Sequence, residues 1–168
     1  FWRGIRLANN AIKYIPQSTA LTDQEKTTWV AEARVLRCWY YMQLLEFYGP
    51  MPWITEPLDP TYTGWNELTR PTYDEIASIL VGELDDVIDS KVLPNRRPAV
   101  EGMHVDNGVA RAIKARILLN NASLLNNPEG DKTKWERAAK AAQDIIDMPE
   151  YSLVPMSQYK SLFVGAFG

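Results

Sequence analysis

The sequence predicts an all-α fold, built from stacked helical hairpins and one long proline-rich loop. Apolar residues recur at spacings of three and four in several segments, which is typical of helices that bury one face. The Thr-x-x-Glu pattern of a helix-starting capping box occurs at Thr22, Thr72 and Thr133. No stretch alternates apolar and polar residues with period two, so no sheet is expected.

The first two helices are expected to form an antiparallel pair. Residues 1–15 are periodic, and Pro16 ends their helix. The apolar side of this helix carries Trp2, Ile5, Ala8 and Ile12. The capping box of Thr22 and Glu25 starts the second helix, which is expected to run without a break into the stretch 29–48.

The stretch 29–48 is the expected centre of the stack, because it carries two apolar stripes. One stripe consists of Trp29, Ala33, Leu36, Tyr40, Leu44 and Phe47. The other consists of Ala31, Val35, Cys38, Met42 and Leu45. A helix with two apolar faces is expected to be covered on two sides, so Leu36 and Cys38 should both be buried. Arg34 and Arg37 fall on the remaining polar face and are expected to pair with nearby acids, and Gly49 is expected to end the helix in a left-handed cap.

Three further helices are expected after the loop. Thr72 opens a helix with an acidic outer face, which is expected to be solvated. That face holds Glu83, Asp85, Asp86 and Asp89. The next helix is expected over 106–125, and the last opens at the capping box of Thr133 and Glu136. The packed face of the last helix holds Trp135, Ala138, Ala139, Ala142, Ile145 and Ile146. This pattern loosely matches the tetratricopeptide repeat and favours tetratricopeptide-like hairpins.

Composition argues against several classes of function. The 18 basic and 21 acidic residues give a net charge of -3 without any basic block, so no nucleic-acid partner is expected. His104 is the only histidine, which excludes a histidine-based triad or metal site within the chain. There is no glycine-rich nucleotide motif, and no catalytic residue, metal or cofactor is expected. Glu56 and Asp59 leave a glycoside hydrolase open as an alternative, because such enzymes use paired carboxylates.

The segment 49–71 carries the candidate binding residues. Its five prolines and two glycines exclude helix over most of its length, yet it contains several aromatic rings. A flat ring can cover the C–H face of a sugar while neighbouring amides bind the hydroxyl groups. Tyr62, Trp65 and Asn66 are therefore the predicted carbohydrate-binding residues. The alternative is that the rings fold back and fasten the loop to the helices, and this is the expectation for Trp53.

Several segments resemble, in order and spacing, the RagB/SusD-type nutrient-uptake lipoproteins of Bacteroidetes outer membranes. With x for a position outside the match, these segments are EARxLR (32–37), YY (40–41), YGxMPxITEPL (48–58), RPTYDEI (70–76), ELDDVI (83–88), GVARAIKARILL (108–119), WERAA (135–139) and YSL (151–153). Pro50 and Trp53 depart from the residues usual in the family. The resemblance covers the chain from about residue 32 to residue 163. It implies an all-helical fold of tetratricopeptide-like hairpins, in agreement with the periodicity.

The resemblance also implies a role and a location. Such a protein would be held at the extracellular face of the outer membrane by an N-terminal lipid, where it captures oligosaccharides for a SusC-like TonB-dependent transporter without catalysis. Residues 1–168 would then be part of a single SusD-like helical domain truncated at both ends, and Cys38 would not be the lipid anchor. No ligand-binding residue transfers by motif. Peptide capture by the same family and a tetratricopeptide-type protein-binding scaffold are the alternatives.

Overall fold

The structure is a computed structural model, and it describes residues 1–98, 100 and 104–164. Within these residues the chain is helical and contains no strand, which confirms the all-α prediction. The α-helices are α1 (Trp2–Tyr14), α2 (Asp23–Tyr48), α3 (Tyr73–Ser90), α4 (Asn107–Ala122) and α5 (Lys132–Ile146). Short 3-10 segments are η1 (Ile15–Gln17), η2 (Gly64–Glu67) and η4 (Met156–Leu162).

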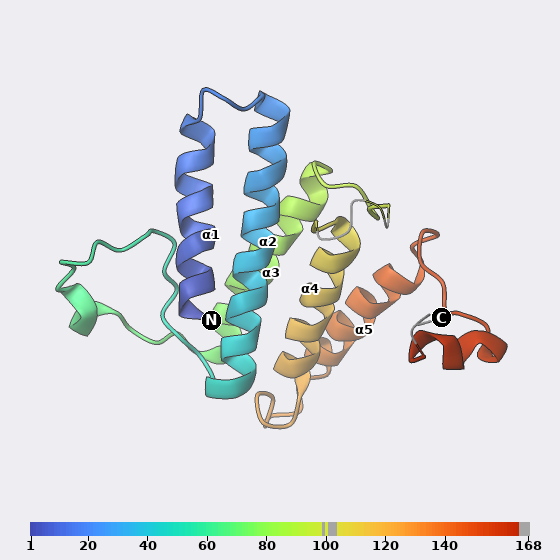
Figure 1. Cartoon of the computed structure of the whole chain (residues 1–168). Helices are drawn as coiled ribbons and strands as arrows, with labels where there is room; N and C mark the ends of the chain where they lie inside the picture. Colours follow the sequence, from blue (N-terminus) through green and yellow to red (C-terminus); the bar gives the residue numbers. More distant parts are fainter. Residues whose placement is uncertain (99, 101–103, 165–168) are drawn as a thin grey trace.

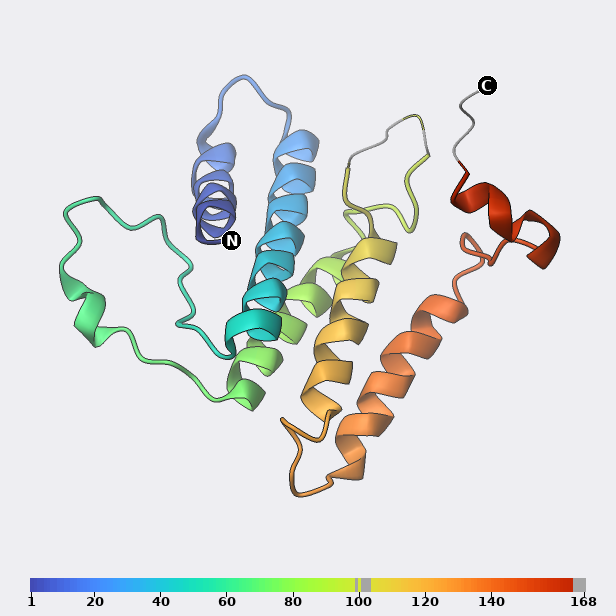
Figure 2. The same cartoon turned by 60° about the horizontal axis from the view of Figure 1, so that its bottom comes forward.

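The helices form a stack of antiparallel hairpins of the tetratricopeptide-like kind. In Figure 1, α1 and α2 stand side by side as one hairpin, and α4 and α5 form another. Helix α3 crosses behind α2 and contacts both α2 and α4, so it joins the two hairpins. Figure 2 shows the same order from another side, with the segment between α2 and α3 lying beyond α1. No helix in the described part of the chain is long and apolar enough to span a bilayer.

Two of the three predicted capping boxes are present. Thr22 Oγ1 accepts from Glu25 N at 3.2 Å while Thr22 N donates to Glu25 Oε2 at 2.8 Å, and Thr72 forms the same box at the start of α3. The box predicted at Thr133 is wrong, because α5 begins earlier. Asp131 is the N-cap residue of this helix, because its carboxylate accepts a hydrogen bond from Thr133 N at 2.8 Å.

Only one of the two apolar stripes of α2 is fully buried. Val35 and Cys38 from the second stripe have no exposed surface, and burial raises the pKa of the Cys38 thiol to about 12, as suits an inert core residue. Leu36 from the first stripe is 41% exposed, and Trp29 and Phe47 are exposed as well, so the expectation for Leu36 is wrong. The helices that contact α2 are α1, α3 and α4, and their packing leaves the side with Leu36 open.

The ends of α2 and α4 differ from the prediction. Helix α4 ends at Ala122 rather than at residue 125, because the Ser123 hydroxyl donates to the Asn120 carbonyl at 2.6 Å and Ser123 itself is extended. Gly49 closes α2 with φ 76 and ψ -163, which is a positive φ but an extended conformation rather than a left-handed helical one. This conformation is essentially restricted to glycine, and it turns the chain out of α2 into the loop.

The outer face of α5 is less buried than its pattern predicts. Ala138 and Ala141 are the buried residues of this helix, whereas Trp135 and Ile146 are 48% and 72% exposed. Helix α5 packs along α4, and its two buried residues are alanines, which leave room for a close approach. The expected packed stripe of α5 is therefore wrong over most of its length: of its six residues Ala138 is buried, Ile145 is partly buried, and the rest, Ala139 and Ala142 included, are exposed.

Candidate functional site

A groove lies between α1 and the connection from α2 to α3, residues 49–72, here called the aromatic loop. In Figure 1 this loop leaves the end of α2, passes beside α1, turns at η2 and returns to α3. The groove has a volume of about 610 Å³. It is lined by Trp2, Arg3, Ile5, Arg6 and Asn9 of α1, and by Met51, Pro52, Ile54, Glu56, Leu58, Trp65, Leu68 and Arg70 of the loop. Its size falls in the range of about 300–1,000 Å³ that is usual for small-molecule sites.

Two buried polar side chains fix the first half of the loop against the helices. The Tyr41 hydroxyl accepts from Ile54 N at 2.8 Å and donates to Pro52 O at 3.0 Å. Burial raises the pKa of Tyr41 to about 12, so the hydroxyl keeps the proton that it donates. Asn9 of α1 donates to the carbonyls of Ile54 and Glu56, at 2.9 and 3.4 Å. The backbone of this segment is therefore held by both α1 and α2.

A buried charge connects this anchor to α3. Arg37 is only 4% exposed, and it donates to Asn9 Oδ1 at 2.9 Å and to Glu83 Oε2 at 2.7 Å. Its guanidinium also lies 4.8 Å from the centre of the Trp53 ring. Burial raises the pKa of Glu83, but hydrogen bonds from Arg34 and Arg37 outweigh that effect and hold it below its usual value.

This cluster settles two expectations for the arginines of α2. Both pair with acids as predicted, since Arg34 binds Glu83 and Asp86 at 3.1 and 3.0 Å. Arg37, however, is buried rather than on a solvated face, and Glu83 is only partly exposed because it turns inward to meet both guanidinium groups. A buried ion pair of this kind survives only with good geometry and further hydrogen bonds, which Asn9 supplies.

The second half of the loop presents a tryptophan to the groove. Trp65 stands on η2 and is 57% exposed. Tyr62 packs edge-on against it, with ring centres 5.0 Å apart and planes at 86°, and its hydroxyl donates to Gly64 O at 3.0 Å. A side chain at Gly64 would come within 2.6 Å of the Tyr62 hydroxyl oxygen, so this close packing requires glycine there.

The predicted carbohydrate-binding residues therefore occupy different positions. Trp65 lines the groove, while Tyr62 supports the Trp65 ring from the side and is not among the lining residues. Asn66 is exposed beside Trp65, and within the described residues its side chain has no hydrogen bond. Trp53 packs against the core, with its ring centre 4.7 Å from that of Tyr41, as the fold-back interpretation expects.

The two loop carboxylates considered for glycoside hydrolysis, Glu56 and Asp59, each have a partner within the protein. Glu56 is paired with Lys13 at 3.2 Å. Asp59 accepts from the side chain and backbone of Thr61, at 2.6 and 2.8 Å, and these bonds lower its pKa. A general acid needs a raised pKa at neutral pH. No group of His, Cys, Asp and Glu residues in the described part of the chain could hold a metal ion.

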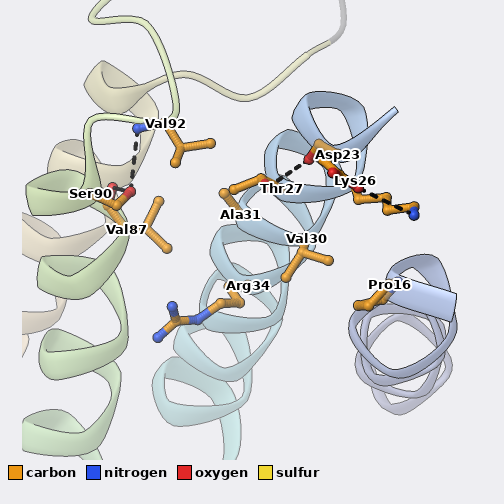
Figure 3. Close-up of a pocket in the computed structure, with 10 residues that line it drawn as sticks. All are labelled: Pro16, Asp23, Lys26, Thr27, Val30, Ala31, Arg34, Val87, Ser90 and Val92. Carbon is orange, nitrogen blue, oxygen red and sulfur yellow. Dashed lines mark hydrogen bonds and ion pairs between the residues drawn. The ribbon is translucent and has the colours of Figure 1, made fainter. Parts of the chain in front are cut away.

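A second hollow, of about 490 Å³, lies where the start of α2 faces the end of α3 (Figure 3). Its polar groups already have partners in the protein. Thr27 donates to Asp23 O at 2.7 Å, Ser90 donates to Val87 O at 2.6 Å, and Arg34 points across the hollow to α3. Because these polar groups already form hydrogen bonds or ion pairs within the protein, we place the candidate site in the groove beside the aromatic loop.

Sequence reasoning missed the part of the site that α1 supplies. Arg3, Arg6 and Asn9 line the groove together with Arg70, which lies more than 60 residues away in the chain. Asn9 was the available signal, because it stands one and two turns from the apolar residues Ile5 and Trp2 on the same side of the helix. A polar residue on a packed face must find a hydrogen-bond partner, and here that partner is the loop.

The fold and the groove together define a class of protein: a tetratricopeptide-like helical scaffold with an aromatic loop beside a groove. Residues 1–119 match the SusD-like family model described as "Starch-binding associating with outer membrane". The chain belongs to this SusD-like family.

Relatives agree with this assignment over nearly the whole chain. A SusD-like protein of Bacteroides ovatus is 22% identical over 165 residues, which cover 97% of this chain and 29% of that protein. Surface glycan-binding protein A from Bacteroides uniformis is 28% identical, with a TM-score of 0.70 over 92% of this chain and 32% of that one. The same-named protein from Bacteroides thetaiotaomicron, solved in complex with laminarihexaose, is 24% identical, with a TM-score of 0.72 over 96% of this chain and 30% of that one. This chain thus spans about a third or less of the length of these relatives.

Proposed function

We propose that this chain captures oligosaccharides in the groove between α1 and the aromatic loop, as part of a protein at the outer-membrane surface. The observation that carries this proposal is the position of Trp65. Its ring is 57% exposed, lines the groove, and is supported from the side by Tyr62. A rigid aromatic face beside polar side chains fits a sugar ring, which has an apolar C–H face and a rim of hydroxyl groups.

The family supports both the ligand and the location. Its description joins starch binding with the outer membrane, and two relatives are named as surface glycan-binding proteins. By this analogy, residues 1–168 would be part of one helical domain of a lipid-anchored protein at the extracellular face, which passes its glycan to a SusC-like TonB-dependent transporter. This wider role rests on the family and not on any contact within the groove.

The proposal is for capture without catalysis. Hydrogen bonds from Thr61 lower the pKa of Asp59, so this carboxylate is ionised at neutral pH and is a poor general acid, and Glu56 lies in an ion pair with Lys13. We expect no turnover of any oligosaccharide in the panel described below. Release of reducing sugar, measured at neutral pH, would instead establish the hydrolase alternative.

The test is a calorimetric titration of the full-length protein with matched panels of oligosaccharides and peptides. Saturable heat is expected with a class of glycan and none with peptides. Trp65→Ala should weaken glycan binding at least about tenfold while leaving the helical circular-dichroism signal intact. Trp29→Ala is the matched control, because Trp29 is 40% exposed on α2 and does not line the groove. Binding to peptides alone would move the function to peptide capture.

A further inference from the structure

Three arginines line the groove beside Trp65. Arg3 and Arg6 come from successive turns of α1, and Arg70 comes from the return of the loop toward α3. All three are exposed, and none forms an ion pair or hydrogen bond with another described residue. By contrast, Arg34, Arg37 and Arg116 each bind a carboxylate of the protein.

Arginines outnumber acidic residues among the side chains that line the groove. Glu56 is the one carboxylate among the lining residues, and it is paired with Lys13. Asp59 accepts two hydrogen bonds from Thr61, and these, with a smaller contribution from Arg6, lower its pKa. With three arginines against one glutamate, the lining of the groove is cationic, although the whole chain has a net charge of -3.

Neutral sugars do not require such an arrangement. Sugar hydroxyl groups form hydrogen bonds with amides and carboxylates, and a neutral sugar carries no charge for an arginine to neutralise. A guanidinium group instead matches a planar carboxylate or a sulfate with two parallel hydrogen bonds. Arg3 and Arg6 lie three residues apart on one helix, so their Cβ atoms are separated by roughly 5–6 Å and can bind one anionic group or two neighbouring ones.

From this charge pattern we propose that the glycan captured here is acidic, and that Arg3, Arg6 and Arg70 bind its anionic groups while Trp65 covers a ring face. The shared chemistry is an anionic sugar, which can be a uronate carboxylate or a sulfate ester. The inference rests on the proposed function, since it names the ligand class of the same groove. The inference predicts that this protein prefers acidic glycans to uncharged glucans.

The test compares three trisaccharides with one backbone, titrated calorimetrically into the full-length protein. They are trigalacturonate, its carboxyl-reduced neutral counterpart, and that neutral counterpart carrying sulfate esters; laminarihexaose is added as an uncharged glucan. At least one anionic probe should bind roughly tenfold more tightly than its neutral counterpart. That preference should shrink at high salt, because exposed charges are screened. Tighter binding of the carboxylate or of the sulfate identifies the source of the charge.

Variants then assign the preference to the arginines. Arg3→Gln, Arg6→Gln and Arg70→Gln should each lower affinity for the anionic probe several-fold and leave affinity for the neutral trisaccharide unchanged. Because the three side chains are exposed, the variants should fold normally. Arg116→Gln is the matched control, since Arg116 lies on α4 away from the groove.

The possible failures are distinct. Equal binding of neutral and anionic probes, or binding of laminarihexaose alone, would overturn the acidic-glycan inference and leave glycan capture standing. Loss of affinity for all glycans alike in the arginine variants would also overturn it. Absence of binding to every glycan, with the protein folded, would overturn the proposed function together with the inference.

Discussion

The two halves of the aromatic loop each contain a glycine, a tryptophan and at least two prolines, but they are held in place by different means. In the first half, residues 49–58, the backbone binds the buried side chains of Tyr41 and Asn9, and the Trp53 ring lies against Arg37. In the second half, residues 59–72, the hydrogen bonds are local. Thr61 binds Asp59, Tyr62 binds Gly64, and the Tyr62 amide donates to Asp59 O at 2.9 Å.

This difference shows that loop composition does not determine whether an aromatic residue is structural or available to a ligand. Trp53 and Trp65 both stand among prolines and polar residues. The Trp53 ring lies against a buried arginine and the Tyr41 ring, while the more exposed Trp65 ring packs edge-on against its neighbour Tyr62. The difference comes from the contacts with the helices. The first half of the loop is bonded to α1 and α2 and supports the groove, whereas the second half places the Trp65 side chain in the groove lining.

The largest effect is expected from Arg37→Ala in the anchored half. The change would leave Asn9 Oδ1 without its donor and the Glu83 carboxylate with Arg34 as its remaining partner. Losing these two charge-assisted hydrogen bonds should cost about 3 kcal/mol or more of unfolding free energy, which urea denaturation of the variant would measure. Arg116→Ala, at an exposed ion pair, should cost no more than about 1 kcal/mol. Equal midpoints for the two variants would show that the anchor does not stabilise the fold.

Acidification should remove part of the same stabilisation. Because the pKa of Glu83 is lower in the folded protein than its ordinary value of 4.5, its ionised form stabilises the fold above that value. This contribution is lost as the pH falls through the lower, folded-state pKa. The gap in stability between the native protein and Glu83→Gln should therefore be widest at neutral pH and close in acid. A gap that is constant with pH would exclude Glu83 as the responsible group.

A smaller effect is expected from Tyr41→Phe. This change keeps the ring against Trp53 but removes the hydroxyl that accepts a hydrogen bond from Ile54 N and donates one to Pro52 O. Leaving these backbone groups unpaired costs about 1–3 kcal/mol, measurable as a lowered denaturation midpoint. Amide hydrogen exchange at Ile54 should also accelerate. Normal protection of that amide would mean that another group holds the loop.

The smallest effect on stability is expected from Trp65→Ala in the second half. The side chain is exposed and contacts its own segment, so the unfolding free energy should change by no more than about 0.5 kcal/mol. Thermal unfolding of the variant measures this directly. A loss comparable with that of Tyr41→Phe would erase the distinction between the two halves and favour a fastening role for Trp65.

Much of the fold followed from local patterns. The pairs Thr22 with Glu25 and Thr72 with Glu75 located two helix starts, because a capping box is a contact within four residues. The burial of α2 was less predictable. Leu36 and Val35 belong to two stripes that are about equally apolar and regular in spacing. Only the packing of the other helices decides that Val35 is buried and Leu36 is exposed.

The site was predictable only in part. Trp65 stood out because an aromatic ring in a proline-rich loop needs an explanation, and it does line the groove. Arg3, Arg6 and Arg70 could not be grouped beforehand, because nothing in a single sequence states that the loop returns across α1. That contact depends on Asn9 meeting a backbone 45 residues further on.

The buried pair of Arg37 and Glu83 also has a consequence for the order of folding during synthesis. Arg37 is separated from Glu83 by 46 residues, so α1, α2 and the first half of the loop are all made before its counter-ion exists. Closing the loop at that stage would bury an unpaired charge. We therefore expect the nascent chain to keep Trp53 in water until α3 has emerged, and fluorescence of arrested chains ending before and after α3 can follow that transition. The groove between α1 and the aromatic loop would then form only after α3, although most of its lining residues are synthesised earlier.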